Sequence, residues 1–295
     1  MVNKNRFIIS GGGTGGHIYP ALSIANKIKQ SFTNSEIKFV GAKGRMEMNI
    51  VPEHGYNIEG LWISGLKRSF SFKNFLLPFK LIISFIHSLF IIIKFNPKFV
   101  IGTGGFASFP IVFISSILRI PTLIQEQNSL PGISNRLLSS YVNYISVAYE
   151  KMEKYFPSKK LFLTGNPIRE SISKSNSSFN LKSKLNIEDS KLVISILGGS
   201  LGSDKINKTI EKNIDFLISK NVFIIWQCGK DYFKDYKKYN SDLIYVTDFI
   251  DDIDSIYNSS DIILARSGAL TLSELAIISK PAILIPSPNV AENHQ

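Results

Sequence analysis

A histidine follows a glycine-rich turn close to the N-terminus of the chain. Glycines occupy most of residues 11–16, and the histidine is His17. Residues 7–10 are mostly apolar and the residues after the turn repeat apolar side chains at helical spacing, which predicts a strand, a turn and a helix. Glycines there let backbone N–H groups and the positive end of the helix approach a phosphate. An ordinary imidazole, with a pKa of about 6.5, accepts a proton near neutral pH, so His17 is a candidate general base.

Three further stretches could bind a phosphorylated ligand. Residues 102–105 form a second glycine turn, and two such turns suit a diphosphate. Ser200 precedes a predicted helix, and its hydroxyl could hold a nucleotide phosphate. Glu274 is expected in the first turn of another helix, where a carboxylate can accept two ribose hydroxyls. Interpretations without a ligand stay open: each glycine turn could merely connect elements, His17 could cap or pack, and Thr271-x-x-Glu274 matches a capping box.

Two common nucleotide-binding motifs match only in part. The glycines of residues 11–16 satisfy the dinucleotide pattern, but the second strand ends without the acid that binds a ribose. In the P-loop pattern, His17 replaces the lysine and Ile18 replaces the residue that holds magnesium. An Asp-x-Asp at residues 252–254 begins a helical stretch, where aspartates serve as caps. We therefore expect neither a metal site nor a bound cofactor.

The composition of the 295-residue chain is typical of a folded protein with two domains. The hydrophobic share of 44% and the charged share of 19% support a sizeable core. The formal net charge of +11 suits an anionic membrane or a phosphorylated substrate, and a lysine-rich compositional bias would also produce it. No zinc spacing, aromatic RNA motif or basic repeat occurs, so no nucleic-acid partner is expected. Cys228 is expected in the core, and we expect no signal peptide.

Strand-like runs alternate with helical stretches along the whole chain. This alternation predicts parallel sheets with helices on both faces. The pattern restarts after residue 167, so we predict an α/β protein with two doubly wound domains joined within residues 164–169. Residues 171–178 are expected to form a surface loop. The predicted strands are residues 7–10, 36–40, 98–101, 121–124, 144–147, 192–197, 222–226, 243–246, 261–265 and 282–285.

An apolar segment at residues 75–95 stands apart from this alternation. A membrane span needs about 20 predominantly apolar residues, and Pro78, His87 and Lys94 are among the residues that interrupt this segment. The segment could be a buried helix of the domain or, least in keeping with the interruptions, a span. Nearby basic residues favour a third role, in which one end enters the interface of an anionic bilayer. The residues expected at that surface are Lys67, Arg68, Lys73, Phe75, Leu76, Phe79 and Lys80.

Taken together and in order, these motifs resemble those of the MurG family of glycosyltransferases. The resemblance runs along the whole chain. The matching motifs are Gly12-Gly13-Thr14-Gly15-Gly16-His17, Gly102-Thr103-Gly104-Gly105, Glu126-Gln127-Asn128, Gly165-Asn166-Pro167-Ile168-Arg169, Gly198-Gly199-Ser200, Phe249-Ile250-Asp251-Asp252, Arg266-Ser267-Gly268-Ala269-Leu270-Thr271 with Ser273-Glu274, and His294-Gln295.

The resemblance implies the GT-B architecture, in which two Rossmann-like domains face each other across a cleft. Residues 1–165 would bind the acceptor and associate with the membrane, and residues 166–295 would bind the UDP-sugar. The second domain would lack its last segment, because family members continue beyond the position of Gln295. The implied activity is inverting transfer of N-acetylglucosamine (GlcNAc) from UDP-GlcNAc to undecaprenyl-diphosphate-MurNAc-pentapeptide (lipid I). The products would be UDP and lipid II, made for peptidoglycan on the cytoplasmic face of the bacterial inner membrane.

The resemblance also implies roles for individual residues, without a metal. His17 is the expected base and Glu126 the alternative, while turn and helix dipoles would stabilise the departing UDP. The acceptor diphosphate would lie at Gly13, Gly104 and Gly105. The expected substrate-binding residues are Thr14, Gly15 and Gly16 at the cleft, Asn128 at the donor sugar, Arg169 and the Ile250 backbone at uracil, Ser200 at the diphosphate, Ala269, Leu270, Thr271, Leu272, Ser273 and Glu274 at sugar, phosphate and ribose, and Gln295 at sugar hydroxyls.

One position departs from the family pattern. Gln125 stands where the family commonly has histidine, so no base is expected there. Two alternatives to the transferase stay open. One is a different GT-B enzyme, such as a lipid galactosyltransferase or a UDP-sugar epimerase. The other is a non-catalytic, membrane-bound subunit that binds a UDP-sugar. An NAD oxidoreductase is disfavoured by the missing ribose acid.

Overall fold

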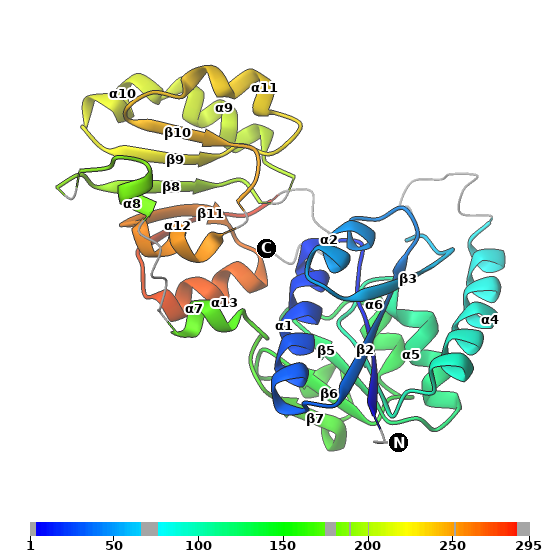
Figure 1. Cartoon of the computed structure of the whole chain (residues 1–295). Coiled ribbons are helices and arrows are strands. Elements are labelled where there is room, and N and C mark those ends of the chain that lie inside the picture. The colour runs from blue at the N-terminus through cyan, green and yellow to red at the C-terminus, as the bar shows by residue number, and fades with distance from the viewer. Residues whose placement is uncertain are drawn as a thin grey trace. The chain divides into compact units, whose positions relative to one another are not determined.

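Runs of β-branched and aromatic residues form a parallel sheet in each half of the chain. The computed structural model describes residues 4–65, 76–174, 181–188, 190–199, 201–250 and 252–287. The chain divides into two units, of which the first ends at Ile168 and the second begins at Arg169. Figure 1 shows that each unit has a central sheet with helices on both faces. The predicted α/β fold class is confirmed.

All neighbouring strands of the first sheet run parallel. Their order is β3-β2-β1-β4-β5-β6-β7, so the chain builds the sheet outwards from β1 in one direction and from β4 in the other. The carboxyl ends of β1 and β4 are therefore the switch point, where open α/β sheets bind ligands. The strands are β1 (Asn5–Ser10), β2 (Ser35–Ala42), β3 (Asn57–Leu61), β4 (Phe99–Gly102), β5 (Thr122–Glu126), β6 (Tyr144–Val147) and β7 (Leu161–Leu163).

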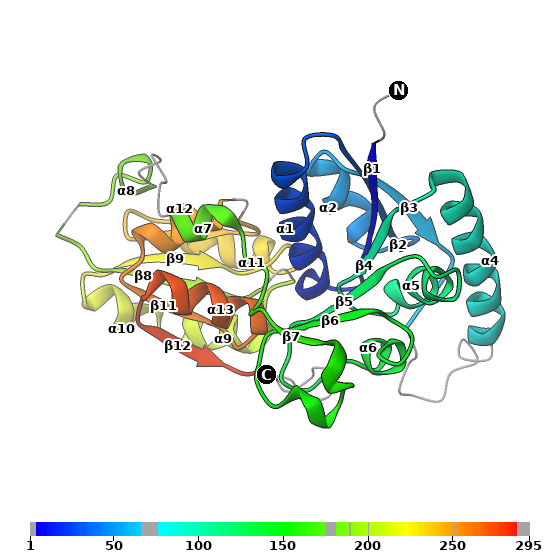
Figure 2. The same ribbon diagram turned by 90° about the horizontal axis from the view of Figure 1, so that it is seen from below.

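Helices cover both faces of the first sheet. Because side chains alternate along a strand, Ile9 packs against helices on one face and Ile8 against helices on the other. Figure 2 shows α1 and α2 on the side of the sheet opposite α5 and α6. The helices are α1 (Gly15–Ser31), α2 (Glu47–Glu53), α4 (Leu77–Phe95), α5 (Ser108–Ile117) and α6 (Ile133–Leu138), with short 3₁₀ turns η1 (Met152–Lys154) and η2 (Ser158–Lys160).

The second sheet repeats this design with fewer strands. Its order is β10-β9-β8-β11-β12, again parallel, so its switch point lies at the carboxyl ends of β8 and β11. The strands are β8 (Val193–Leu197), β9 (Phe223–Gln227), β10 (Ile244–Thr247), β11 (Ile262–Arg266) and β12 (Ala282–Ile285). The helices are α7 (Glu170–Lys174), α8 (Leu181–Lys184), α9 (Asp204–Lys212), α10 (Ile214–Ser219), α11 (Phe233–Tyr236), η3 (Lys237–Tyr239), α12 (Ile253–Ser259) and α13 (Ala269–Ile278).

Most local predictions from the sequence agree with these elements. Every predicted strand is present, whereas β3 and β7 were missed because β3 includes polar residues and β7 has three residues. The loop predicted at residues 171–178 is wrong at its start, where α7 extends to Lys174, and its remainder lies outside the described residues. Cys228 is buried as predicted, and burial raises the pKa of its thiol to about 11, so the thiol stays protonated at neutral pH.

Helix α4 exposes most of its apolar side chains. Within the described ranges it is the one helix long and apolar enough to cross a membrane, and 22% of its apolar window is buried. The prediction of a helix is confirmed. Its interpretation as a buried helix of the domain is wrong, because one whole face of the helix consists of exposed apolar side chains. We call this set the apolar stripe: Phe79, Ile82, Ile83, Ile86, Leu89, Phe90 and Ile93.

Candidate active site

Two glycine turns leave the first sheet next to each other at its switch point. Ser10 and Gly102 are register partners at the ends of β1 and β4. Residues 11–14 follow the first strand and residues 103–105 follow the second. The Thr103 N–H donates to the Ser10 carbonyl at 2.8 Å, which ties the start of one turn to the other. The two turns that the sequence singled out therefore lie side by side.

Backbone atoms of these turns pack directly against one another. Gly105 has a φ of +79°, and a Cβ there would lie 2.3 Å from the carbonyl oxygen of Gly12. Gly104 has a φ of +96°, and its Cβ would lie 2.9 Å from the Nδ1 atom of His17. Side chains larger than hydrogen are strained at such φ values. The packing of the turns thus requires glycine at both positions.

Helix α1 begins at this edge of the sheet. Thr14 precedes it in an extended conformation, its side chain makes no capping hydrogen bond, and the first turn has no acidic residue. Thr14 and Gly16 are exposed, and Gly15 is partly exposed. The helix therefore presents an exposed N-terminus, with its partial positive charge, next to the glycine turns.

His17 is oriented by two acceptor oxygens. Its Nδ1 lies 3.0 Å from the Thr103 carbonyl and 3.1 Å from Oε1 of Gln127. The amide nitrogen of Gln127 also donates to the Thr103 carbonyl, at 2.8 Å, which fixes the direction of that amide. A carbonyl only accepts hydrogen bonds, so Nδ1 of the neutral ring carries the proton and Nε2 is the basic nitrogen. This is the tautomer that lets Nε2 accept a proton.

Glu47 supports the first glycine turn and was missed by the sequence analysis. It is fully buried at the start of α2. Its Oε2 accepts a hydrogen bond from the Gly13 N–H and its Oε1 one from the Ala42 N–H, each at 3.0 Å. The Gly13 N–H, which we assigned to the acceptor diphosphate, is therefore engaged within the protein. The signal in the sequence was an acidic residue shortly after the second strand, beyond the strand end where a ribose-binding acid is expected.

Glu126 has its hydrogen-bonding capacity filled by the loop that follows β5. Its Oε1 accepts from the N–H and the side-chain amide of Asn128, at 3.0 and 3.1 Å. Its Oε2 accepts from the Gly132 N–H at 3.1 Å and from the Asn135 amide at 2.8 Å. Glu126 is 1% exposed. These contacts fix the loop that carries Asn128, the residue predicted to reach the donor sugar.

The switch point of the second sheet carries another glycine turn. Gly199 and Gly202 have φ values of +86° and +77°, and the Gly202 N–H donates to the Gly199 carbonyl at 2.8 Å. The side chain of Gln227 donates to the same carbonyl at 2.9 Å. Ser203 then caps α9, with its Oγ accepting from the Ile206 N–H at 3.3 Å. The turn and the capped helix correspond to the predicted phosphate-binding stretch.

Arg266 connects this turn to the last strand. It ends β11, and its Nη2 donates to the Oγ of Ser203. Its Nη1 donates to the carbonyl oxygens of Ile285 and Pro286, at 3.2 and 3.0 Å. Burial lowers the pKa of the guanidinium from its ordinary value. Arg266 thus braces the loops that follow β8 and β12 from the strand between them.

The predicted donor-binding stretch, residues 269–274, lies in α13. The helix begins at Ala269 and Gly268 is its N-cap, so the predicted capping box is wrong and Thr271 lies inside the helix. Glu274 lies in the second turn, not in the first as expected, because the helix begins earlier. Ala269, Leu270, Thr271, Leu272 and Ser273 are partly exposed, and Glu274 is buried.

Glu274 is held between two other elements of the second unit. Its Oε2 accepts a hydrogen bond from the Tyr257 hydroxyl of α12 at 2.9 Å. Its Oε1 lies 3.9 Å from Nε of Arg169, the residue before α7. Burial raises the pKa of the Glu274 carboxyl, although the charge of Arg169 and the Tyr257 hydrogen bond lower it. The structure thus brings together the two residues predicted to bind uracil and ribose.

Helix α12 is capped by an aspartate, as predicted. Asp252 is the N-cap, and its Oδ1 accepts from the Ser255 N–H at 3.1 Å. Ile250 is partly buried against the core of this unit.

The described residues contain no group of three or more His, Cys, Asp or Glu side chains placed to hold a metal ion. Several predicted residues lie outside the described ranges: Lys67, Arg68, Lys73, Phe75, Ser200 and Gln295.

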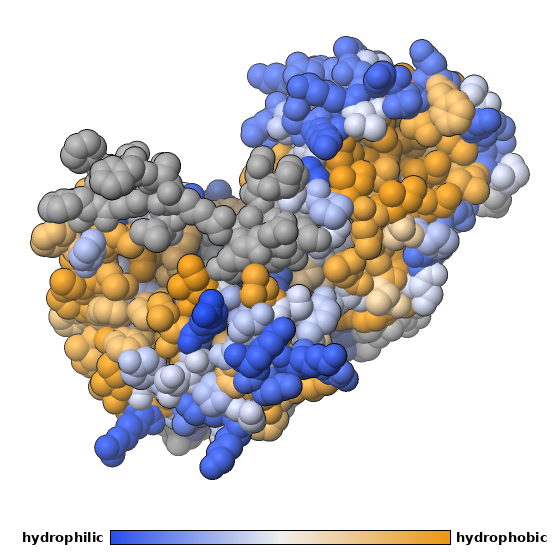
Figure 3. Space-filling view, turned by 180° about the vertical axis from the view of Figure 1, so that it is seen from behind, coloured by the Kyte–Doolittle hydropathy of each residue, from blue (hydrophilic) through white to orange (hydrophobic). Residues whose placement is uncertain are grey.

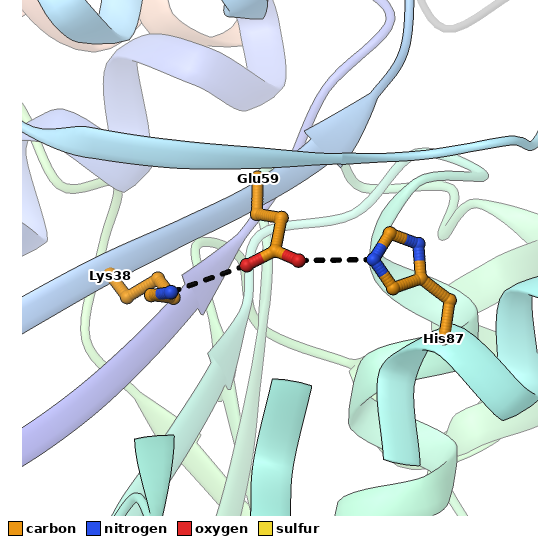
Figure 4. A network of polar contacts seen from close by, with 3 residues as sticks. All are labelled: Lys38, Glu59 and His87. Atoms are coloured by element: carbon orange, nitrogen blue, oxygen red, sulfur yellow. Dashed lines mark hydrogen bonds and ion pairs between the residues drawn. The ribbon is translucent and has the colours of Figure 1, made fainter. Parts of the chain in front are cut away.

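Polar contacts attach α4 to the first unit on the side opposite its apolar stripe. Figure 4 shows Glu59 of β3 between Lys38 and His87, with its oxygens 3.2 Å from Nζ of Lys38 and 3.0 Å from Nε2 of His87. Burial alone would raise the pKa of Glu59, but hydrogen bonds from His87 and Lys38 outweigh it and lower that pKa. Ser84 donates to the Trp62 carbonyl at 3.2 Å, and Lys80 donates to Ser64 at 3.2 Å.

The outer surface of α4 is therefore apolar. Figure 3 shows hydrophobic residues gathered over the side of the first unit that carries this helix. The exposed fractions of Phe79, Phe90 and Ile93 are 58%, 64% and 66%. Leu76, which precedes the helix, is also exposed. Soluble monomers rarely leave such a continuous patch uncovered, so this face is a candidate membrane or protein contact.

Comparison with known proteins gives the same family for both units. Residues 7–147 match the glycosyltransferase family 28 N-terminal domain, and residues 193–295 match its C-terminal domain. A UDP-N-acetylglucosamine–N-acetylmuramyl-(pentapeptide) pyrophosphoryl-undecaprenol N-acetylglucosamine transferase of Flavobacterium psychrophilum is 52% identical. That alignment covers 100% of this chain and 81% of the relative.

Solved structures share the fold. The MurG structure from Acinetobacter baumannii has a TM-score of 0.70 at 24% identity, covering 99% of this chain and 81% of the other. A UDP-GlcNAc 2-epimerase from Neisseria meningitidis, bound to UDP-GlcNAc, has a TM-score of 0.64 at 17% identity. That match covers 97% of this chain and 83% of the epimerase. At these identities the structures establish the architecture alone.

Proposed function

Since the chain belongs to glycosyltransferase family 28, we infer that it transfers GlcNAc from UDP-GlcNAc to undecaprenyl-diphosphate-linked N-acetylmuramyl-pentapeptide. The 52% identity to a transferase with this activity, along the whole chain, carries the inference. The glycine turns at both switch points agree with it, because each substrate contains a diphosphate. The products are UDP and the GlcNAc-MurNAc lipid of peptidoglycan synthesis.

We assign acceptor binding to the first domain, residues 1–165. The exposed N-terminus of α1, with Thr14, Gly15 and Gly16, would face the lipid-linked diphosphate. Gly104 and Gly105 would add backbone N–H groups from the adjacent turn. Gly13 would contribute less to this contact, because its N–H already donates to Glu47. The support for this assignment is the convergence of both turns with α1 and His17.

Within this site, His17 is a better base than Glu126. Nε2 of His17 is the basic nitrogen of the neutral ring, whereas Glu126 accepts four hydrogen bonds from its own loop. In the proposed step, the acceptor hydroxyl oxygen attacks the anomeric carbon of GlcNAc and its proton passes to Nε2. The bond from that carbon to the UDP oxygen breaks with inversion, and UDP leaves with the electron pair. Helix and turn dipoles would stabilise the negative charge that develops on UDP.

We assign donor binding to the second domain, residues 166–295. Ser200 would contact the diphosphate, and residues 269–273 would contact the sugar and phosphates. Glu274 would accept from the ribose hydroxyls, while Arg169 and the Ile250 backbone would recognise uracil. The 3.9 Å separation of Arg169 and Glu274 supports this grouping, because uracil and ribose are neighbours in UDP. Asn128 and Gln295 would contact the transferred sugar.

Turnover by the purified chain tests this function. With UDP-GlcNAc and a soluble lipid I analogue, we expect UDP release and an acceptor lengthened by one GlcNAc, as measured by mass spectrometry. Omitting the acceptor should reduce UDP release to background, and UDP-galactose should not replace UDP-GlcNAc. UDP-GlcNAc binding without turnover would indicate a binding subunit. A 2-epimerised sugar as the product would indicate an epimerase.

We also propose that α4 places the enzyme on the cytoplasmic face of the inner membrane. The apolar stripe would enter the headgroup boundary of an anionic bilayer. Leu76 and Phe79 lie at the N-terminal end of α4, where basic residues would attract acidic lipids. Lys80 belongs to the same end, but its ammonium donates to Ser64 on the inner side of the helix. The sequence assigns Lys67, Arg68, Lys73 and Phe75 to the same surface. Because the acceptor is lipid-linked, such an orientation would bring the first domain to its substrate.

Replacing Leu76 and Phe79 by glutamate should weaken binding to phosphatidylglycerol vesicles by about tenfold or more, because charged groups replace apolar ones at the bilayer boundary. Vesicle co-sedimentation measures this change. The matched control is Phe216→Glu, because Phe216 on α10 is 60% exposed and Phe79 58%. This control should leave vesicle binding unchanged, and both variants should bind UDP normally. Equal losses in the two variants would contradict the placement of the membrane surface.

A further inference from the structure

Tyr257 lies behind the carboxylate that we assign to the ribose. It is 2% exposed and packs in the core of the second unit. Its hydroxyl donates to Oε2 of Glu274 at 2.9 Å. Tyr257 comes from α12 and Glu274 from α13, so the bond joins two helices on one face of the sheet. Burial raises the pKa of Tyr257, so its hydroxyl remains a donor at neutral pH.

This bond limits how the Glu274 carboxylate can turn. A glutamate side chain has several rotatable bonds, and an unrestrained carboxylate can exchange its two oxygens or leave its position. With Oε2 held by Tyr257, the second oxygen, Oε1, lies on the side of Arg169, 3.9 Å from its Nε. One oxygen is thus committed to the protein core and the other to the side that carries the uracil-binding candidate.

The hydrogen bond also stabilises the charged form of a buried group. Glu274 is 7% exposed, and a buried carboxylate without hydrogen bonds is costly. Arg169 and Tyr257 offset this cost, whereas Asp254 on α12 opposes it. A ribose hydroxyl binds more strongly to a carboxylate than to a neutral acid, because charge-assisted hydrogen bonds are stronger.

We propose that Tyr257 is a positioning residue for ribose recognition: its hydroxyl orients Glu274 so that one carboxylate oxygen faces the ribose hydroxyls of UDP-GlcNAc. The proposal rests on the proposed function and adds to it a residue that does not itself touch the nucleotide. It also identifies the part of the donor that the residue controls. Loss of the hydroxyl should therefore affect only nucleotides that have ribose hydroxyls.

The test compares UDP with 2′,3′-dideoxy-UDP, which lacks both ribose hydroxyls, by calorimetric titration of the full chain. In Tyr257→Phe, we expect UDP affinity to fall about tenfold, the size of one lost hydrogen bond to a charged group, and dideoxy-UDP affinity to stay unchanged. Glu274→Gln should show the same selective loss. Adding Tyr257→Phe to Glu274→Gln should cause no further loss of affinity, because both changes act on the same contact between the Glu274 carboxylate and the ribose hydroxyls.

The control is Tyr56→Phe, which removes a buried hydroxyl from the first unit, where Tyr56 donates to Asn26 at 2.6 Å. It should leave affinity for both nucleotides unchanged. Equal losses for the two nucleotides in Tyr257→Phe would overturn the proposal, because they would indicate a general structural effect. Normal UDP binding by Tyr257→Phe would also overturn it. Either result would leave the proposed transferase function standing as long as the wild-type chain turns over its substrates. Absence of turnover by the wild-type chain would instead contradict the transferase function itself.

Discussion

Replacing His17 with alanine is expected to lower kcat by about 10²- to 10⁴-fold, the usual effect of losing a general base. The ring is held by Thr103 and Gln127 with Nε2 as its basic nitrogen, and alanine offers no replacement for it. UDP affinity should not change, because the contacts that we assign to the UDP moiety lie in the second unit. UDP release with a lipid I analogue measures kcat, and calorimetry measures UDP affinity.

The pH profile distinguishes this base from its alternative. In the wild type, kcat should fall as pH drops through the pKa of the base, because the protonated ring cannot accept the hydroxyl proton. This acidic limb should disappear in His17→Ala and persist in Glu126→Gln. His54→Ala is a matched control, since His54 is exposed and its Nδ1 lies 2.8 Å from the Ile50 carbonyl, within its own helical turn and away from the glycine turns. Wild-type rates in His17→Ala would falsify the base assignment.

Replacing Gly105 with alanine should strongly destabilise the first unit. We expect the loss to exceed, by at least about 2 kcal/mol, that of the same replacement at a glycine that has an equal φ but open space around its Cα. The new Cβ would lie 2.3 Å from the Gly12 carbonyl oxygen, so the two turns would have to separate. Separation would also move the Thr103 carbonyl that orients His17. We therefore expect the KM for the acceptor to rise about tenfold, a loss of 1.4 kcal/mol in binding.

Gly55 provides the matched control for this prediction. Its φ is also +79°, but nothing lies within 4 Å of a Cβ built on it. Gly55→Ala should cost about 1 kcal/mol, the strain of a left-handed alanine, without changing the acceptor KM. Urea unfolding of both variants measures the difference in free energy. Equal destabilisation would mean that contact between the turns contributes nothing.

Local patterns in the sequence were sufficient for most elements of the fold. The apolar run, the glycines and the helical spacing of residues 7–28 predict β1, its turn and α1, because each signal concerns neighbouring residues. Strand β3 was missed because Glu59 breaks its apolar pattern. A glutamate in this strand is stabilised by ion pairs with Lys38 and His87, which are distant from Glu59 in the sequence. The contacts that justify such a strand are not local.

The candidate site shows the same limit. The pair of glycine turns and His17 were found from type and spacing, and the structure brings them together. Glu47 carries no motif of its own, and its role depends on α2 folding back under the turn at Gly13. The environment of Glu126 likewise depends on a loop whose path the sequence does not reveal. Sequence patterns thus identified side chains that could take part in chemistry. They did not identify the partners that orient these side chains or accept their hydrogen bonds.

The polar contacts of α4 prevent the helix from rolling about its own axis. Lys80, Ser84 and His87 lie along one side, and each bonds to a partner on or just after β3. All three bonds would have to break together before the helix could rotate. A rotated helix would turn these groups outwards and hide part of the stripe. In the membrane association that we propose, the residues that would contact lipid are therefore selected by partners on the inner side of the helix.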